Sequence, residues 1–197
     1  MKARVSHLAA QPSRLAWKVL AGAMFGFVMM VASASAASTG GLCPYAQQSQ
    51  AFIAYGDSNY YTLVPNGNFA NTAGGGWQLS GGAAIVAATL PNGTSGYALS
   101  LPHGARAISP AMCVDSTYAL ARTYLKSTNS SGLGITGLAA GHKQSQTIKG
   151  TSSWTSPSAV NVLPSVSGAT QLQLVLESSG SSGSNLVYGL YIDPRMR

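Results

Sequence analysis

Hydrophobic and polar residues alternate with a period of two along three segments of the chain, residues 97–101, 118–126 and 171–177. In the last of these, Leu172, Leu174 and Leu176 alternate with Gln171, Gln173 and Val175. Successive side chains of a β-strand point to opposite faces, so each segment predicts a strand with one buried face. In residues 118–126 the alternation places Ala121, Thr123 and Leu125 on one side and Tyr118, Arg122 and Tyr124 on the other.

Shorter apolar segments separated by turn signals fill most of the remaining chain. Pro-Asn-Gly at residues 65–67, three glycines at 74–76 and a Ser/Gly stretch at 178–184 supply the conformations that tight turns need. No helical pattern longer than about two turns follows residue 37. The pattern predicts an all-β fold, a two-sheet antiparallel β-sandwich of jelly-roll type. The predicted strands are residues 51–55, 60–64, 77–79, 83–88, 97–101, 105–109, 118–126, 134–138, 145–149, 160–162, 172–177 and 186–192.

The first residues have a different pattern. Basic residues without any acidic residue precede an apolar run at 19–31, which is followed by the small residues 32–37. This succession predicts a Sec-type signal-peptide helix over residues 1–37, with cleavage near Ala36–Ala37 and secretion to the extracellular side. The alternative is an uncleaved membrane anchor, but the apolar run is shorter than the about 20 residues that a spanning helix needs. We therefore expect no stable membrane insertion after cleavage.

The domain organisation follows from this assignment: a signal peptide at 1–37, an N-terminal arm at 38–50 and a β-sandwich domain at 51–197. The mature part has two cysteines, Cys43 and Cys113. An even count in an exported protein predicts a disulfide that ties the arm to the domain, against the alternative of two buried free thiols.

The net charge of the chain says little about which partner it binds. The full chain has a formal net charge of +7, but four of its eleven Lys and Arg lie in the leader. The mature part therefore keeps seven basic against four acidic residues, a net charge of +3 without clusters. A nucleic-acid binder usually shows a concentrated basic stripe, so no nucleic-acid partner is expected. The sequence does not indicate an oligomeric state.

Two motifs resemble the opening of the galactose-binding-like β-sandwiches, a group that includes many carbohydrate-binding modules. They are Leu-Val-Pro-Asn-Gly-Asn-Phe at 63–69 and Trp-Gln-Leu-Ser-Gly-Gly at 77–82. The later order is also similar, with residues 97–101, Trp154 and residues 187–192 at the family's later strand positions. The resemblance implies a jelly-roll sandwich, core positions for Trp77 and Trp154, and a glycan as partner.

The sequence departs from this family at the positions that often hold calcium in relatives. Ala70 replaces the acidic residue after the first Phe, and Tyr188-Gly189 replaces the closing Asp pair. Calcium prefers several oxygen ligands that include carboxylates. With four acidic residues in the mature part, we expect no metal and no cofactor.

The sequence contains little that indicates a catalytic site. Residues 52–58 end in Gly-Asp-Ser and resemble the nucleophile block of GDS-type esterases, with Ser58 as the candidate nucleophile. Those enzymes supply their base from a C-terminal D-x-x-H, which is absent here because Asp193 precedes Pro-Arg-Met. A glycosidase needs a pair of carboxyl groups, which would have to come from the four acidic residues of the mature part. Ordinary positions in turns or at strand edges account for these four residues. We expect no catalytic residue and no enzyme.

One strand offers a binding platform. Tyr118, Arg122 and Tyr124 share a side of the predicted strand 118–126, where tyrosine faces and a guanidinium would suit stacking and hydrogen bonding to a sugar. The competing interpretation is that this side is packed, with Arg122 at the rim. The function predicted first is an exported, non-catalytic sandwich that binds an extracellular or cell-wall carbohydrate. The alternatives are a structural or adhesive surface protein without a small ligand and, third, a GDS-type esterase.

Overall fold

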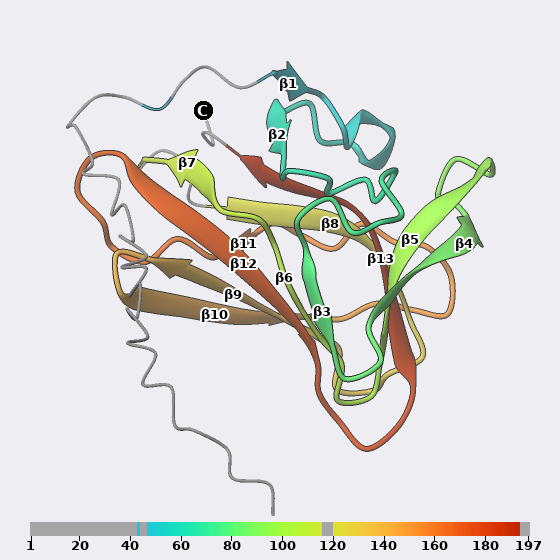
Figure 1. Cartoon of the computed structure of the whole chain (residues 1–197). Helices are drawn as coiled ribbons and strands as arrows, with labels where there is room; N and C mark the ends of the chain where they lie inside the picture. The colour runs from blue at the N-terminus through green and yellow to red at the C-terminus, as the bar shows by residue number, and fades with distance from the viewer. Residues whose placement is uncertain (1–42, 44–46, 116–119, 194–197) are drawn as a thin grey trace, which may run out of the picture. The chain divides into compact units, whose positions relative to one another are not determined.

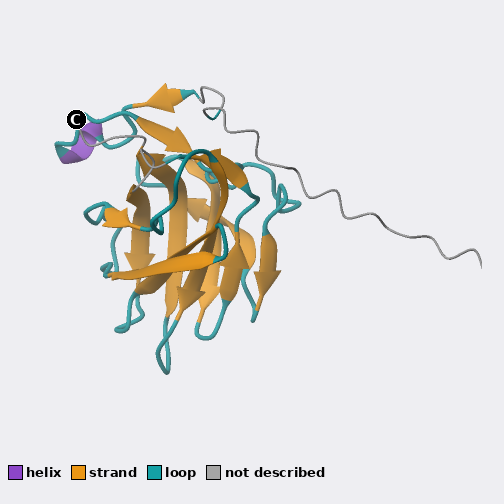
Figure 2. Ribbon diagram, turned by 90° about the vertical axis from the view of Figure 1, so that its left-hand side faces the viewer, coloured by secondary structure: helices purple, strands orange, loops and turns teal. Residues whose placement is uncertain are grey.

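The computed structural model describes residues 43, 47–115 and 120–193. They form two antiparallel β-sheets, one of seven strands and one of six, packed face to face as Figure 1 and Figure 2 show. The β-sandwich predicted from the sequence is therefore confirmed. The predicted signal peptide lies outside the described residues, and no helix within them is long and apolar enough to cross a membrane.

Sheet A, the seven-stranded sheet, is organised around its longest strand, β13. One edge of β13 pairs with β8, and the other pairs with β5 and, further along, with β2. The members of sheet A are β1 (Gln48–Ser49), β2 (Tyr61–Leu63), β4 (Ala84–Thr89), β5 (Ser95–Pro102), β8 (Leu120–Ser127), β11 (Val160–Asn161) and β13 (Ser184–Asp193).

Sheet B, the six-stranded sheet, is organised around β12 in the same way. One edge of β12 pairs with β9, and the other pairs with β7 and β6 in turn. The members of sheet B are β3 (Gln78–Ser80), β6 (Arg106–Ile108), β7 (Met112–Val114), β9 (Leu133–Ala139), β10 (His142–Ile148) and β12 (Thr170–Ser178).

The core lies between the sheets and follows the alternation in the sequence. Leu172, Leu174 and Leu176 of β12 are fully buried against Leu99 and Leu125 of sheet A within one hydrophobic cluster. Since the inward residues of β8 are also buried, Arg122 and Tyr124 point to the outer face of sheet A. The period-two prediction for these strands is confirmed.

The predicted disulfide is present. Cys43 and Cys113 are bonded, with their Cα atoms 5.6 Å apart. Met112 and Val114 on either side of Cys113 pack against the core, so Cys113 itself lies on the outer face of sheet B.

Two predictions from the sequence are wrong in detail. Residues 51–55 are not a strand: a turn leads into a 3₁₀ helix, η1 (Ile53–Tyr55), which Gly56 ends in a left-handed conformation with φ of 76°. Phe52 is buried while Ile53 and Tyr55 are exposed, and the period-two pattern is absent there. Trp154 is not in the core: it is half-buried, and its indole N–H donates to the carbonyl oxygen of Thr89 at 2.7 Å.

Substitution of one glycine in β9 should destabilise the sandwich strongly. A Cβ on Gly137 would lie 1.7 Å from the carbonyl oxygen of Val162, which is backbone and cannot swing aside. We expect Gly137→Ala to lower the free energy of unfolding by about 3 kcal/mol, as overpacking does. The matched control is Gly134→Ala in the same strand, where the nearest atom would be 3.5 Å away. Denaturant titrations that give both variants the same stability would contradict this account of the contact.

Candidate functional site

The outer face of sheet A holds the side chains that the sequence predicts as a binding platform. Arg122 and Tyr124 lie there side by side along β8, and Tyr118 lies outside the described residues. Neither of these two described side chains is fully exposed to solvent, because the segment that follows β1 folds over both of them.

An aromatic cluster holds this segment against the sheet. It consists of Phe52, Tyr61, Tyr124, Tyr188 and Tyr191. Phe52 is fully buried at its centre, with ring centroids 4.9 Å from Tyr61, 5.0 Å from Tyr124 and 5.4 Å from Tyr191. Burying an aromatic side chain is worth roughly 2–3 kcal/mol, and its edge-to-face contacts add to that. Phe52 therefore fixes the segment.

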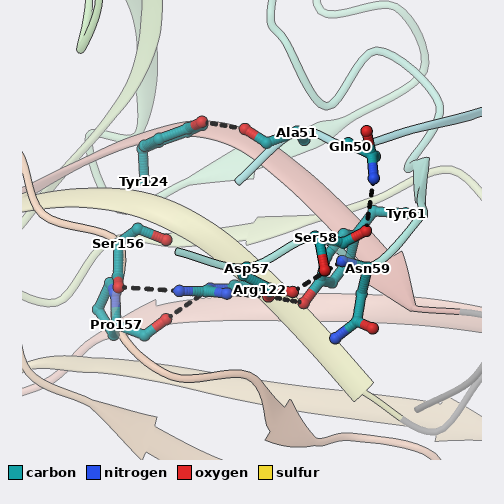
Figure 3. A network of polar contacts seen from close by, with 10 residues as sticks. All are labelled: Gln50, Ala51, Asp57, Ser58, Asn59, Tyr61, Arg122, Tyr124, Ser156 and Pro157. Carbon is teal, nitrogen blue, oxygen red and sulfur yellow. Dashed lines mark hydrogen bonds and ion pairs between the residues drawn. The ribbon is translucent and has the colours of Figure 1, made fainter. Parts of the chain in front are cut away.

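Arg122 is the charged centre of the same contact. Its guanidinium forms an ion pair with Asp57, lies 4.6 Å from the centre of the Phe52 ring, and donates from Nε to the carbonyl oxygen of Pro157 at 3.0 Å. Figure 3 shows these polar contacts together. The side chains of Arg122 and Asp57 are only 11% and 15% exposed, so water screens this pair less than a surface pair.

Asp57 is held as a carboxylate by several donors. The phenol of Tyr61 donates to it at 2.5 Å and the backbone N–H of Asn59 at 3.0 Å, in addition to Arg122. Burial alone raises the pKa of the carboxyl group, but these hydrogen bonds and the nearby guanidinium outweigh it, so the pKa of Asp57 lies below its ordinary value. Asp57 is therefore ionised at neutral pH and balances the charge of Arg122.

Tyr61 and Tyr124 of the cluster stay neutral at ordinary pH. Burial, together with the Asp57 carboxylate, raises the pKa of Tyr61 to about 12, and burial among neighbouring tyrosines raises the pKa of Tyr124 to about 12. The Tyr124 hydroxyl donates to the carbonyl oxygen of Ala51. The chain thus uses the predicted platform residues to hold its own residues 51–57, which we call the latch.

The outer face of sheet B carries an open hollow of about 520 Å³. It lies where the β9–β10 turn approaches the start of β12. Polar residues, among them Gln171, Gln173 and Lys143, line it together with aliphatic residues such as Leu138. The lining residues are Ala111, Leu138, Ala139, Ala140, Gly141, His142, Lys143, Gln171 and Gln173.

The strand register explains why these side chains meet. Leu138 is the pairing partner of both Lys143 on β10 and Gln173 on β12, so the three side chains form one row across the sheet. Gln173 donates to the carbonyl oxygen of Ser109 at 3.3 Å, while Gln171 is exposed. No pattern in the sequence indicates the hollow, since its residues are brought together only by the pairing of three strands.

The disulfide borders this hollow. Cys113 is paired with Gln171 across β7 and β12, and it is bonded to Cys43 at the start of the arm. The chain then reaches β1 at the edge of sheet A. Residues 43–57 are therefore fastened to sheet B at one end and to sheet A at the other.

Three residues that the sequence offered for catalysis, Ser58, Asp57 and Glu177, have other contacts in the described part of the chain. Ser58 is exposed after η1, and its carbonyl oxygen accepts a hydrogen bond from Gln50. Asp57 is paired with Arg122, and Glu177 with Arg106 at 3.0 Å. Within the described ranges there is also no group of three side chains able to hold a metal ion.

Comparison with known proteins gives relatives in structure only. No protein-family model matches the chain, and no curated protein sequence matches it. Solved structures similar to it include the carbohydrate-binding module TmCBM61 in complex with β-1,4-galactotriose, at 15% identity and a TM-score of 0.43, covering 66% of this chain and 96% of that one. Another is the xylan-binding CBM22-1 domain from Paenibacillus barcinonensis Xyn10C, at 14% identity and a TM-score of 0.40, covering 66% and 93%.

A third is a family 6 carbohydrate-binding module from Clostridium cellulolyticum in complex with xylose, at 17% identity and a TM-score of 0.41, covering 55% of this chain and 85% of that one. These neighbours confirm the predicted likeness to carbohydrate-binding β-sandwiches. At such identities and TM-scores the likeness carries no argument about function, which has to come from this chain's own side chains.

The ion pair in the latch predicts a pH-dependent stability. Because the pKa of Asp57 is lowered in the folded state, its contribution is present above the unfolded-state pKa and is lost as the pH falls through the folded-state pKa. We expect Asp57→Asn to lower the free energy of unfolding by about 2 kcal/mol at pH 7. The difference from the unsubstituted protein should shrink at acidic pH, below about pH 4.

The control for this experiment is Glu177→Gln, which breaks the exposed pair with Arg106, whose side chains are 45% and 52% exposed. An exposed pair is worth less than about 1 kcal/mol, so this variant should stay close to the unsubstituted protein. An Asp57→Asn penalty that is equally large at pH 3 and pH 7 would show that the carboxylate charge is not what holds the latch.

Proposed function

We propose that the protein is an exported, non-catalytic β-sandwich that binds an extracellular or cell-wall glycan on the outer face of sheet B. The observation that carries the proposal is the hollow at Leu138, which is lined both by aliphatic residues and by the polar residues Gln171 and Gln173. A sugar ring has apolar C–H faces and a girdle of hydroxyl groups, so it needs both kinds of surface at once.

The neighbouring surface suits a polysaccharide chain better than a small charged ligand. Among the described residues that line the hollow, Lys143 is the only Lys or Arg. The next row on the same face pairs the hydroxyl groups of Thr136 and Ser145, whose oxygen atoms are 2.9 Å apart. Neutral hydroxyl and amide groups continue along the strands, as a ligand with repeated hydroxyl groups requires. A single Lys favours neutral or acidic glycans over basic ones.

Binding through Arg122 and Tyr124, as the sequence predicted, remains a competing location within the same proposal. Two observations favour sheet B instead. Arg122 already contacts Asp57, Phe52 and Pro157, and Tyr124 contacts Phe52 and Ala51. A ligand there would have to displace the latch and break these contacts, whereas the hollow on sheet B requires no displacement.

Retention on insoluble cell-wall and plant polysaccharides, including xylan, tests the proposal. We expect retention on at least one of them, and the double variant Gln171→Ala/Gln173→Ala should weaken it by about 30-fold, since each of the two hydrogen bonds is worth about 1 kcal/mol. The matched control is Gln78→Ala, which removes an exposed amide from β3 on the same sheet away from the hollow.

Three outcomes would count against this proposal. Retention on no polysaccharide would favour a structural or adhesive protein without a small ligand. If Gln78→Ala weakened retention as much as the double variant does, the hollow would not be the binding site. Loss of binding in Tyr124→Ala with an unchanged melting temperature would move the site to sheet A, because a packed Tyr124 should instead lose about 3 kcal/mol of stability on truncation.

A further inference from the structure

The edge of sheet A at β4 is long, uncharged and open. The strand Ala84–Thr89 reads Ala-Ile-Val-Ala-Ala-Thr and is the last strand of its sheet. Ala87 and Thr89 are exposed. Natural proteins usually protect such an edge with a charge, a proline, a bulge, a very short strand or a covering loop. The strand β4 has none of the first four, and Trp154 contacts it at Thr89.

The direction of the backbone groups on β4 follows from its hairpin. The N–H of Leu90 donates to the carbonyl oxygen of Thr94 on the β5 side, at 2.8 Å, and Ala88 is paired with Gly96 in the same register. Because the peptide groups of a strand alternate in direction, Ile85, Ala87 and Thr89 direct their N–H and C=O groups away from β5. The Thr89 carbonyl accepts the indole N–H of Trp154. The outward groups of Ile85 and Ala87 have no partner within the described residues.

The other edges in the described part of the chain are protected. Exposed His142 and Lys143 begin β10, the edge of sheet B. The strands β3 and β7 have three residues each, and β1 and β11 have two. Among the strands that the structure describes, only β4 presents a long row of backbone groups without a charged side chain, which is the surface that β-strand addition uses.

The charge distribution identifies the partner as a second copy of this chain. The mature part carries a net charge of +3, yet no Lys, Arg, Asp or Glu occurs between Asp57 and Arg106. Two cationic molecules therefore approach with the least repulsion through the β4–β5 hairpin. Tyr97, which is 43% exposed and paired with Ala87, adds apolar surface beside the edge.

Going beyond the proposed function, we propose that two copies pair antiparallel through β4, so that sheet A continues from one copy into the other. Isologous pairing of this kind has a two-fold axis. Because Trp154 occupies the Thr89 carbonyl, the register that uses only free groups places Ile85 opposite Ala87 of the second copy, with the axis at Val86. No charged side chain enters the pairing.

Sedimentation equilibrium of the purified protein tests the association. We expect a dimer at micromolar concentrations. Ala87→Lys puts like charges close to the axis and should weaken dimerisation by about 100-fold or more. Thr147→Lys adds the same charge to an exposed position on β10 and should leave the dimer intact. A protein that is monomeric up to about 100 µM, or two Lys variants with the same effect, would overturn the proposal.

Cross-linking tests the register and does not depend on the stability of the Lys variant. Val86 would face its own counterpart across the axis in a non-hydrogen-bonded pair, whose Cβ atoms are about 5 Å apart. Val86→Cys should therefore form a covalent dimer on mild oxidation, seen on a non-reducing gel. Ala88→Cys is the control, because two such residues would be about 13 Å apart along the strands. Equal cross-linking of both variants would contradict the register.

Discussion

A half-buried guanidinium on the outer face of a sheet needs a counter-charge, and this requirement organises one side of the protein. Arg122 is placed there by the alternation of β8, because its neighbours in the strand face the core. Asp57 supplies the carboxylate, and Phe52 supplies the ring against which the guanidinium packs. Removing either charge would leave the other buried without a partner, which costs more than a surface pair is worth.

This constraint makes the two outer faces of the sandwich different. On sheet A, the latch and the aromatic cluster cover Arg122 and Tyr124, so their polar groups are directed at the chain itself. On sheet B, polar and aliphatic residues together line an open hollow, and the hydroxyl pair of Thr136 and Ser145 forms the next row. The Cys43–Cys113 disulfide joins both faces, since it fastens the start of the arm beside the hollow. The difference between the covered outer face of sheet A and the open outer face of sheet B thus follows from side-chain chemistry.

Strands with strict alternation could be predicted from the sequence, because burial of one face of a sheet is a local, period-two signal. The buried leucines of β12 and the outward position of Arg122 both follow from it. The latch could not be predicted, because Phe52, Asp57 and Arg122 are brought together only by tertiary packing. The apolar residues 51–55 also have the sequence pattern of a strand. The hollow depends on the pairing of β9, β10 and β12. The position of Trp154 depends on the contact of its loop with β4.

The central claim is that the open face of sheet B, and not the latched face of sheet A, meets the ligand. Amide chemical shifts of the protein titrated with soluble β-1,4-galactotriose and with xylo-oligosaccharides test it directly. The account predicts that binding shifts the signals of residues around the hollow, among them Leu138, Lys143 and Gln171, while those of Phe52 and Arg122 stay in place. Shifts confined to Phe52, Asp57 and Arg122 would contradict it.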